Sequence, residues 1–157
     1  MRIDEDEPVP ATPPPFGSRG GRAVYADGSA LAQFLPGAAH RDAWLVWTYG
    51  RRLVTSPVGI TELHGLAFPL GAAARTAADD AEAGVEVLRF SDQALQTASH
   101  VSTALSSFVA MHLGTAVADP DVDTVATYDV DLARVAALYR LAVVSPGWPD
   151  RWWEGVR

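Results

Sequence analysis

The sequence of 157 residues contains no cysteine and no lysine. Without cysteine, the chain can form neither a disulfide framework nor a thiolate metal site, and it has no cysteine nucleophile. All twelve basic residues are arginines, and nineteen acidic residues bring the formal net charge to -7. Proteins that coat nucleic acid without sequence preference usually have a basic surface, so this charge balance argues against that role.

Long apolar runs are also absent. No run approaches the roughly 18 apolar residues that span a bilayer, and the first residues are acidic and rich in proline, unlike a secretory signal peptide. We therefore expect a cytoplasmic protein with no membrane segment. The hydrophobic fraction of 48% and the charged fraction of 20% are ordinary for a soluble domain, and the length suits one domain with a substantial core.

Composition divides the chain into three parts. Residues 1–22 combine an acidic run, three consecutive prolines and a Gly/Arg-rich end, which predicts a flexible tail. Residues 23–147 form the expected folded domain. Residues 148–157 make a C-terminal tail rich in tryptophan, which we expect to cover an apolar surface or to contact a partner.

Short apolar strands alternate with helical patterns along the expected domain. This alternation predicts an α/β fold with three layers, in which helices cover both faces of a parallel, Rossmann-like sheet. Strands are expected at 23–26, 53–55, 85–88 and 141–144, and a further strand is expected to begin at Val125 and to end after Ala126. Helices are expected at 29–35, 38–50, 71–83, 92–105 and 107–117, with further helices beginning near 58 and after 129.

Acidic residues follow three of the expected strands. Asp27 comes directly after the first strand, Glu62 comes shortly after the second, and Asp129 comes directly after the fourth. The carboxyl ends of parallel strands meet at one edge of the sheet, where ligands bind, so we expect these three carboxylates to lie within reach of one another, with Asp131 nearby.

Two explanations of this acidic pattern remain open. Crowded carboxylates repel one another unless a cation joins them, and a site made only of oxygen ligands favours Mg²⁺ or Mn²⁺. Such an ion could position a phosphate and activate water for attack on it. Isolated acids that cap helices would give the same pattern.

Five segments, taken in order, resemble the motifs of PIN-domain nucleases, with the nearest likeness to the VapC-type toxins of bacterial toxin–antitoxin pairs. The resemblance covers roughly residues 23–147. The segments are VYADGSAL at 24–31, VTSP at 54–57 followed by TEL at 61–63, MHLGTA at 111–116, VATYD at 125–129 and VVSPG at 143–147.

The resemblance implies a function as well as a PIN-like fold. It implies a metal-dependent endoribonuclease that cuts structured RNA with Mg²⁺ or Mn²⁺, is usually a homodimer and is silenced by a small antitoxin protein. It also implies that Asp27, Glu62 and Asp129 are the catalytic and metal-binding acids. Ser29 would hydrogen-bond to the metal shell.

The sequence departs from this family at two positions. Val109 stands where the family usually has an aspartate, three residues before His112, and the loss of an anionic ligand lowers metal affinity. Asp131 could replace it in part as a further metal ligand, although its offset from Asp129 points it elsewhere on a helix. Gly28 stands where a hydroxyl residue is commoner, which we expect to loosen the turn.

Val109 therefore keeps a second function open. A catalytically degenerate PIN-fold module would keep the scaffold and bind a protein partner or RNA without cleaving it. Val109 favours this alternative. The three remaining acids favour the nuclease, because mutually repelling carboxylates are of no use to a site without a cation.

The four histidines are scattered along the sequence. They form no i,i+4 pair, and no Gly-x-Ser-x-Gly turn is present, so the sequence indicates neither a zinc site nor an acyl-transfer triad. For His112 we expect packing or a hydrogen bond in preference to catalysis.

Overall fold

The computed structural model describes residues 21–156, and the tail predicted for residues 1–22 lies almost entirely outside this range. The strands of the described residues form one sheet, in which every neighbouring pair is parallel and the spatial order is β3-β2-β1-β4-β5. The strands are β1 (Ala23–Ala26), β2 (Arg52–Thr55), β3 (Glu86–Val87), β4 (Val122–Ala126) and β5 (Ala142–Val144).

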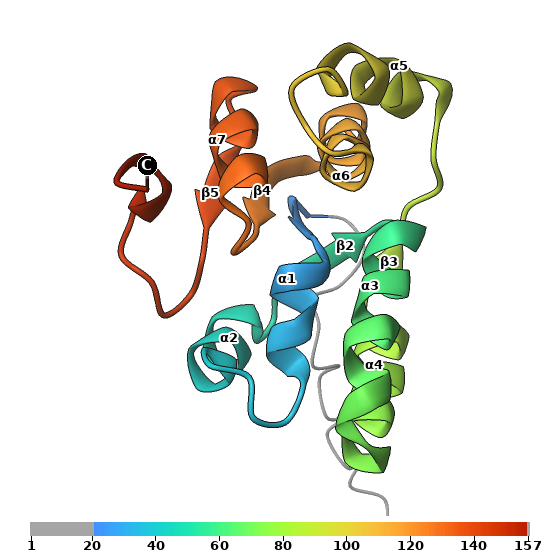
Figure 1. The fold of residues 1–157 in the computed structure, drawn as a ribbon, viewed down its shortest axis with the longest axis vertical. Helices are drawn as coiled ribbons and strands as arrows, with labels where there is room; N and C mark the ends of the chain where they lie inside the picture. Colours follow the sequence, from blue (N-terminus) through green and yellow to red (C-terminus); the bar gives the residue numbers. More distant parts are fainter. Residues whose placement is uncertain (1–20, 157) are drawn as a thin grey trace, which may run out of the picture.

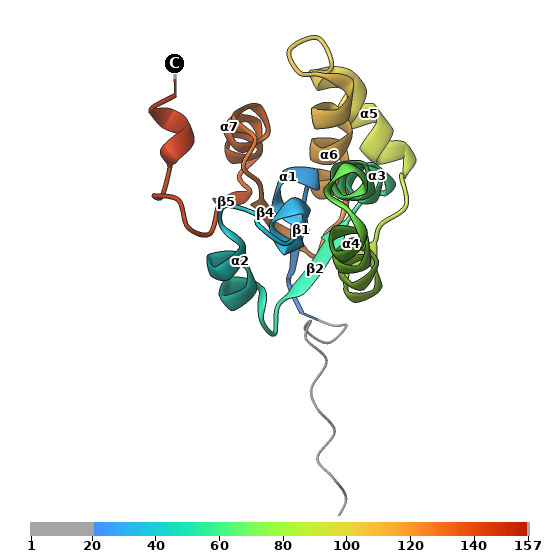
Figure 2. The same cartoon turned by 60° about the horizontal axis from the view of Figure 1, so that its bottom comes forward.

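Helices cover both faces of this sheet (Figure 1, Figure 2). One face carries α1 (Gly28–Leu31), α2 (Arg41–Thr48), α3 (Pro57–Ala67) and α4 (Ala72–Gly84). The other face carries α5 (Asp92–Val101), α6 (Ser107–Ala118) and α7 (Val130–Leu138). The predicted three-layer α/β architecture is confirmed.

The two cores follow from the alternation of side chains along the strands. In β1, Val24 and Ala26 pack against the helices of the first face, while Tyr25 packs against α6 and α7 on the second. All of β1 is buried because it is the central strand. Trp44 of α2 is fully buried in the first core.

Side-chain caps begin most of the helices. Asp27 caps α1 and Asp129 caps α7, while serines cap α3, α5 and α6. The caps of α1, α3 and α7 directly follow β1, β2 and a short turn after β4. The register pairs Ala26 of β1 with Ala126 of β4, so these strands end side by side. The predicted common edge is therefore confirmed.

β4 ends at Ala126, where the sequence prediction placed the end of this strand, but it begins at Val122, ahead of the predicted start at Val125. The N–H of Thr127 still donates to the carbonyl of Val144 in β5 at 3.1 Å. The chain then turns towards α1, where the N–H of Tyr128 donates to Oγ of Ser29 at 2.8 Å. This turn carries residues of the site described below.

Several helices are shorter than predicted. The helix expected at 29–35 is divided into α1 and a 3-10 turn, η1 (Ala32–Phe34), and ends because Leu35, which precedes a proline, is extended. The helices expected at 38–50 and 92–105 are α2 and α5, which end at Thr48 and Val101. A second 3-10 turn, η2 (Phe68–Leu70), links α3 to α4. Within residues 21–156, no helix combines the length and apolarity needed to cross a membrane.

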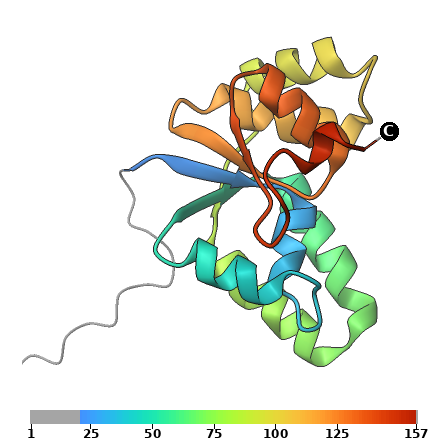
Figure 3. The ribbon, with the colours of Figure 1, turned by 90° about the vertical axis from the view of Figure 1, so that its left-hand side faces the viewer.

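The C-terminal tail folds back onto the domain and lies beside α7 (Figure 3). Its 3-10 turn, η3 (Trp152–Glu154), buries Trp153, whose carbonyl accepts a hydrogen bond from Nε of Arg134 at 3.2 Å. Nε1 of Trp152 donates to Oγ of Ser145, just after β5, at 2.8 Å. The tail thus covers part of its own domain.

Candidate functional site

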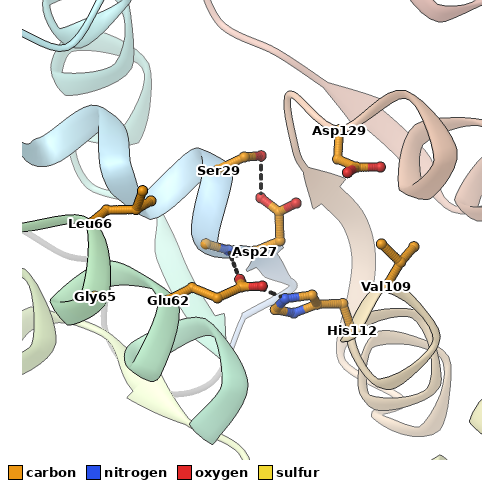
Figure 4. Close-up of a pocket in the computed structure, with 9 residues that line it drawn as sticks. Asp27, Ser29, Glu62, Gly65, Leu66, Val109, His112 and Asp129 are labelled. Atoms are coloured by element: carbon orange, nitrogen blue, oxygen red, sulfur yellow. Dashed lines mark hydrogen bonds and ion pairs between the residues drawn. The ribbon is translucent and has the colours of Figure 1, made fainter. Parts of the chain in front are cut away.

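A cavity of about 440 Å³ opens at the carboxyl edge of the sheet (Figure 4). The turn after β1, helices α3 and α6, and the turn after β4 supply its walls. The residues that line it are Asp27, Gly28, Ser29, Glu62, Gly65, Leu66, Val109, His112 and Asp129. Three carboxylates from distant parts of the chain therefore share one cavity.

Asp27 is the most deeply buried of these acids, with 3% of its surface exposed. Its Oδ1 accepts hydrogen bonds from Oγ of Ser29 at 2.7 Å and from the N–H of Ala30 at 2.9 Å, and its Oδ2 accepts one from Oγ1 of Thr127 at 2.6 Å. Burial raises the pKa of the Asp27 carboxyl above its ordinary value, while His112 and these hydrogen bonds oppose the rise.

Glu62 reaches the cavity from α3 and lies against the start of α1. Its Oε2 accepts a hydrogen bond from the N–H of Gly28 at 3.0 Å. A Cβ on Gly28 would lie 2.0 Å from Oε2 and 2.5 Å from Cβ of Glu62, so only glycine leaves room for this approach. The expectation that Gly28 loosens the turn is therefore replaced by a steric role.

His112 is a second partner of Glu62. Nε2 of His112 lies 2.9 Å from Oε2 of Glu62, and because a carboxylate only accepts, the ring donates from Nε2. Nδ1 of the same ring bonds with the hydroxyl of Tyr25 at 2.8 Å. Burial raises the pKa of the Tyr25 hydroxyl, which keeps it a phenol. The predicted hydrogen-bonding role of His112 is confirmed.

Asp129 lies at the opposite side of the cavity. Its Oδ1 accepts hydrogen bonds from the N–H groups of Asp131 and Leu132, both at 2.9 Å, and so caps α7. The side chain of Asp131 is exposed, and Asp131 is not among the residues that line the cavity. The structure therefore brings Asp27, Glu62, Asp129 and Ser29 together and leaves Asp131 outside.

Val109 lines the cavity from α6, one turn before His112. Its isopropyl group and the side chain of Leu66 give the cavity apolar surface on two sides, at the right and the left of Figure 4. The position that resembles a family aspartate thus contributes apolar surface in place of oxygen.

The carboxylates of the cavity are the type of ligand that a hard divalent cation prefers, but their present arrangement does not suit such an ion. Carboxylate oxygens are the ligands that Mg²⁺ and Mn²⁺ prefer, and three carboxylates face one cavity. Both oxygens of Asp27 accept hydrogen bonds, however, and one oxygen each of Glu62 and Asp129 does so too. Across residues 21–156, no three His, Asp or Glu side chains are grouped closely enough to hold a metal ion.

Comparison with known proteins identifies the fold. No family model matches the sequence, and no curated protein does so. The structure of VapC20 from Mycobacterium tuberculosis, described as a toxin that cleaves the sarcin-ricin loop, has a TM-score of 0.57 with this chain at 16% sequence identity, covering 71% of this chain and 94% of the toxin. PAE2754 from Pyrobaculum aerophilum has a TM-score of 0.55 at 21% identity, covering 80% of this chain and 86% of its own.

The chain has a PIN-like fold. The five parallel strands and the helices on both faces match these neighbours. The TM-scores of 0.57 and 0.55 support this fold, and at sequence identities of 16% and 21% the likeness shows the fold alone, so any chemistry has to be argued from the cavity itself.

Sequence reasoning missed the groups that hold the acids of this PIN-like fold in place. The hydroxyl of Thr127 donates a hydrogen bond to Asp27 and also accepts one from the N–H of Asp129 at 3.0 Å. The carbonyl of Thr127 in turn accepts a hydrogen bond from Oγ of Ser145, and this Oγ accepts one from Nε1 of Trp152. The one sign of these groups in the sequence was the position of Thr127, directly before the Tyr-Asp pair in the segment at 125–129. The link to the C-terminal tail gave none, because it depends on how the tail folds back.

Proposed function

We propose that this protein is a metal-dependent endoribonuclease of the VapC type, in which Asp27, Glu62 and Asp129 hold Mg²⁺ or Mn²⁺ and hydrolysis cuts an RNA phosphodiester bond. The observation that carries this proposal is that carboxylates following three different strands line one cavity. Mutual repulsion and burial make such an arrangement costly, and a bound cation removes that cost. Resemblance to toxins adds a small antitoxin and a homodimer as proposed partners.

Each residue of the cavity has a separate role in this proposal. Ser29 and Thr127 donate hydrogen bonds that favour the ionised form of Asp27 and fix its orientation. The N–H of Gly28 positions Glu62, and Asp129 keeps one oxygen free of the helix cap. When bound, the cation supplies a nucleophilic water and offsets the charge that builds on the phosphate.

A second candidate function is a catalytically silent PIN-fold module that binds RNA or a protein. Two observations favour it. Val109 leaves the cavity one carboxylate short of the family pattern, and the hydrogen bonds of Glu62 to Gly28 and His112 hold that carboxylate apart from Asp129. The two candidates differ in one measurable property, which is cleavage of RNA in the presence of a divalent cation.

The deciding experiment measures cleavage of structured RNA by the purified chain with Mg²⁺ or Mn²⁺. Asp27→Asn and Glu62→Gln each remove a proposed ligand, Val109→Asp adds a carboxylate, and Asp80→Asn on the exposed face of α4 is the matched control. Cation-dependent cleavage that is lost in Asp27→Asn and Glu62→Gln and kept in Asp80→Asn would establish the nuclease. Cleavage by Val109→Asp alone would establish the silent module, and no cleavage by any variant would overturn the nuclease proposal.

A further inference from the structure

Glu62 is held by two N–H donors that converge on the same oxygen. The N–H of Gly28 lies 3.0 Å from Oε2 on one side, and Nε2 of His112 lies 2.9 Å from it on the other. The imidazole ring is 2% exposed, so water hardly competes for this contact. The Glu62 carboxylate is therefore fixed, although about a third of its side chain is exposed, at 35%.

The ring of His112 is itself anchored from behind. Tyr25, in the fully buried central strand, bonds with Nδ1 at 2.8 Å and meets the ring edge to face, with centroids 5.8 Å apart. This contact fixes the ring orientation and places Nε2 at Glu62. The chain of contacts from Tyr25 through His112 to Glu62 connects β1, α6 and α3.

This chain of contacts holds Oε2 of Glu62 against two protein donors, the N–H of Gly28 and Nε2 of His112. Figure 4 shows the Glu62 carboxylate beside His112, while the Asp27 carboxylate points towards Ser29. Among the described residues no three potential ligands are grouped around one point. The contact with His112 thus maintains an arrangement in which the three carboxylates do not share an ion.

We propose that His112 is a positioning residue that closes the cavity by holding Glu62, and that a divalent cation must displace Glu62 from His112 in order to bind. The inference rests on the proposed function, because it concerns regulation of the same cavity. His112 opposes cation binding in the native chain, and Val109 adds to this effect by withholding a carboxylate that could compete for the ion.

The direction in which the loss of His112 changes the affinity for a divalent cation distinguishes a closing role from a role in which His112 supports binding. In many metal sites, a hydrogen bond to a ligand orients that ligand, and its removal weakens metal binding by about 10–100-fold. If His112 closes the cavity, its removal strengthens binding, because the cation no longer competes with a charge-assisted hydrogen bond. A bond of this type corresponds to a change in Kd of about tenfold or more.

The test measures Mn²⁺ binding to the full chain by calorimetry, with circular dichroism as the check on folding. We expect His112→Ala to lower the Kd for Mn²⁺ by about tenfold. Tyr25→Phe keeps the contact between His112 and Glu62 but releases the back of the ring, so it should lower the Kd by less. Val109→Asp, which adds a ligand, is the positive control for detection. A Kd that is unchanged or raised in His112→Ala would overturn the inference.

A measurement on the native chain covers the case in which His112→Ala does not fold. Nitrogen and proton resonances of the His112 ring are followed by NMR while Mg²⁺ is added, with His100 on α5 as the control ring. If Mg²⁺ displaces Glu62, the His112 resonances shift during the titration and reach their final positions at the Mg²⁺ concentration that saturates binding. Those of His100 stay constant. Saturation with Mg²⁺ that leaves the His112 ring unchanged would contradict the inference.

Failure of the inference and failure of the proposed function give different results. Tighter Mn²⁺ binding by His112→Ala without RNA cleavage by any variant supports the closing role and overturns the nuclease. Cation-dependent cleavage by the native chain, together with weaker Mn²⁺ binding by His112→Ala, supports the nuclease and overturns the closing role. Absence of Mn²⁺ binding in both His112→Ala and Val109→Asp overturns both.

Discussion

Thr127 donates its hydroxyl hydrogen to Oδ2 of Asp27 at 2.6 Å, although the two residues are 100 positions apart in the sequence. This contact joins the ends of two neighbouring parallel strands and stabilises a carboxylate that is almost completely buried. It opposes the effect of burial on the Asp27 pKa but does not cancel it, because the net direction is upward.

The raised pKa of Asp27 predicts that the stability of Asp27→Asn relative to the native chain increases between pH 4 and pH 7 in the absence of divalent cations. A carboxyl whose pKa is raised by folding binds protons more readily in the folded state, so the native chain loses stability as the pH rises above about 4, the ordinary pKa range of aspartate. Asparagine does not ionise and avoids this loss, although its amide replaces one acceptor oxygen by a donor, at a cost that does not vary with pH. We expect the stability difference to move in favour of Asp27→Asn by about 0.5–2 kcal/mol between pH 4 and pH 7. Thermal unfolding across this range checks it, and an equal difference at every pH would contradict it.

Thr127→Val is expected to destabilise the fold by about 1–3 kcal/mol. Valine has nearly the same shape but no hydroxyl, so Oδ2 of Asp27 loses its donor and the N–H of Asp129 loses its acceptor. Urea unfolding with an unchanged m-value gives the measurement. Thr124→Val, in β4 just before this turn and partly exposed, is the matched control and should change stability by no more than about 0.5 kcal/mol. Equal effects of the two variants would argue against a role for the buried contact.

Gly28→Ala is expected to lower the free energy of unfolding by about 1–3 kcal/mol, the usual effect of overpacking. The new Cβ would lie 2.0 Å from Oε2 and 2.5 Å from Cβ of Glu62, so α3 as well as the carboxylate must shift. Gly65→Ala, in α3 with nothing within 4 Å of its new Cβ, should instead stabilise the helix by up to about 1 kcal/mol. The two variants are compared by chemical unfolding, and a neutral Gly28→Ala would show that Glu62 moves freely.

Trp152→Phe is expected to loosen the turn after β4 without unfolding the domain. Phenylalanine keeps an aromatic ring but removes the N–H that donates to Oγ of Ser145, the residue that supports the carbonyl of Thr127. The expected loss of stability is about 1 kcal/mol. Amide hydrogen exchange should become faster at residues 127–129, whereas the amides of β2 keep their rates. Unchanged exchange at Thr127 would show that the tail does not support the turn.

The sequence was most informative where local rules determine structure. Acids directly after apolar strands predicted the edge where Asp27 and Asp129 lie. Both explanations offered for the acids hold together, because Asp27 and Asp129 cap helices and also line the cavity. Local pattern could therefore locate these side chains but could not separate their two roles.

The remaining contacts depend on the order of the strands in space. Tyr25 meets His112 only because the second face of β1 packs against α6, and Glu62 reaches Gly28 only because β2 lies beside β1. No spacing in the sequence encodes such pairs. The exposed position of Asp131 likewise depends on the residue at which α7 begins. If the helix began one residue earlier or later, the side chain of Asp131 would point to another side of it.

The central position of β1 has a consequence for the order in which the protein is made. β1 is synthesised first among the strands, and β2 can pair with it early, but the other side of β1 stays open until β4 has been added. The Thr127 hydroxyl that donates to Asp27 and the helix that carries His112 also come from the part of the chain that follows β2. A nascent chain that is still short of residue 127 therefore has no finished cavity, and any activity of the site has to wait until this residue has been added.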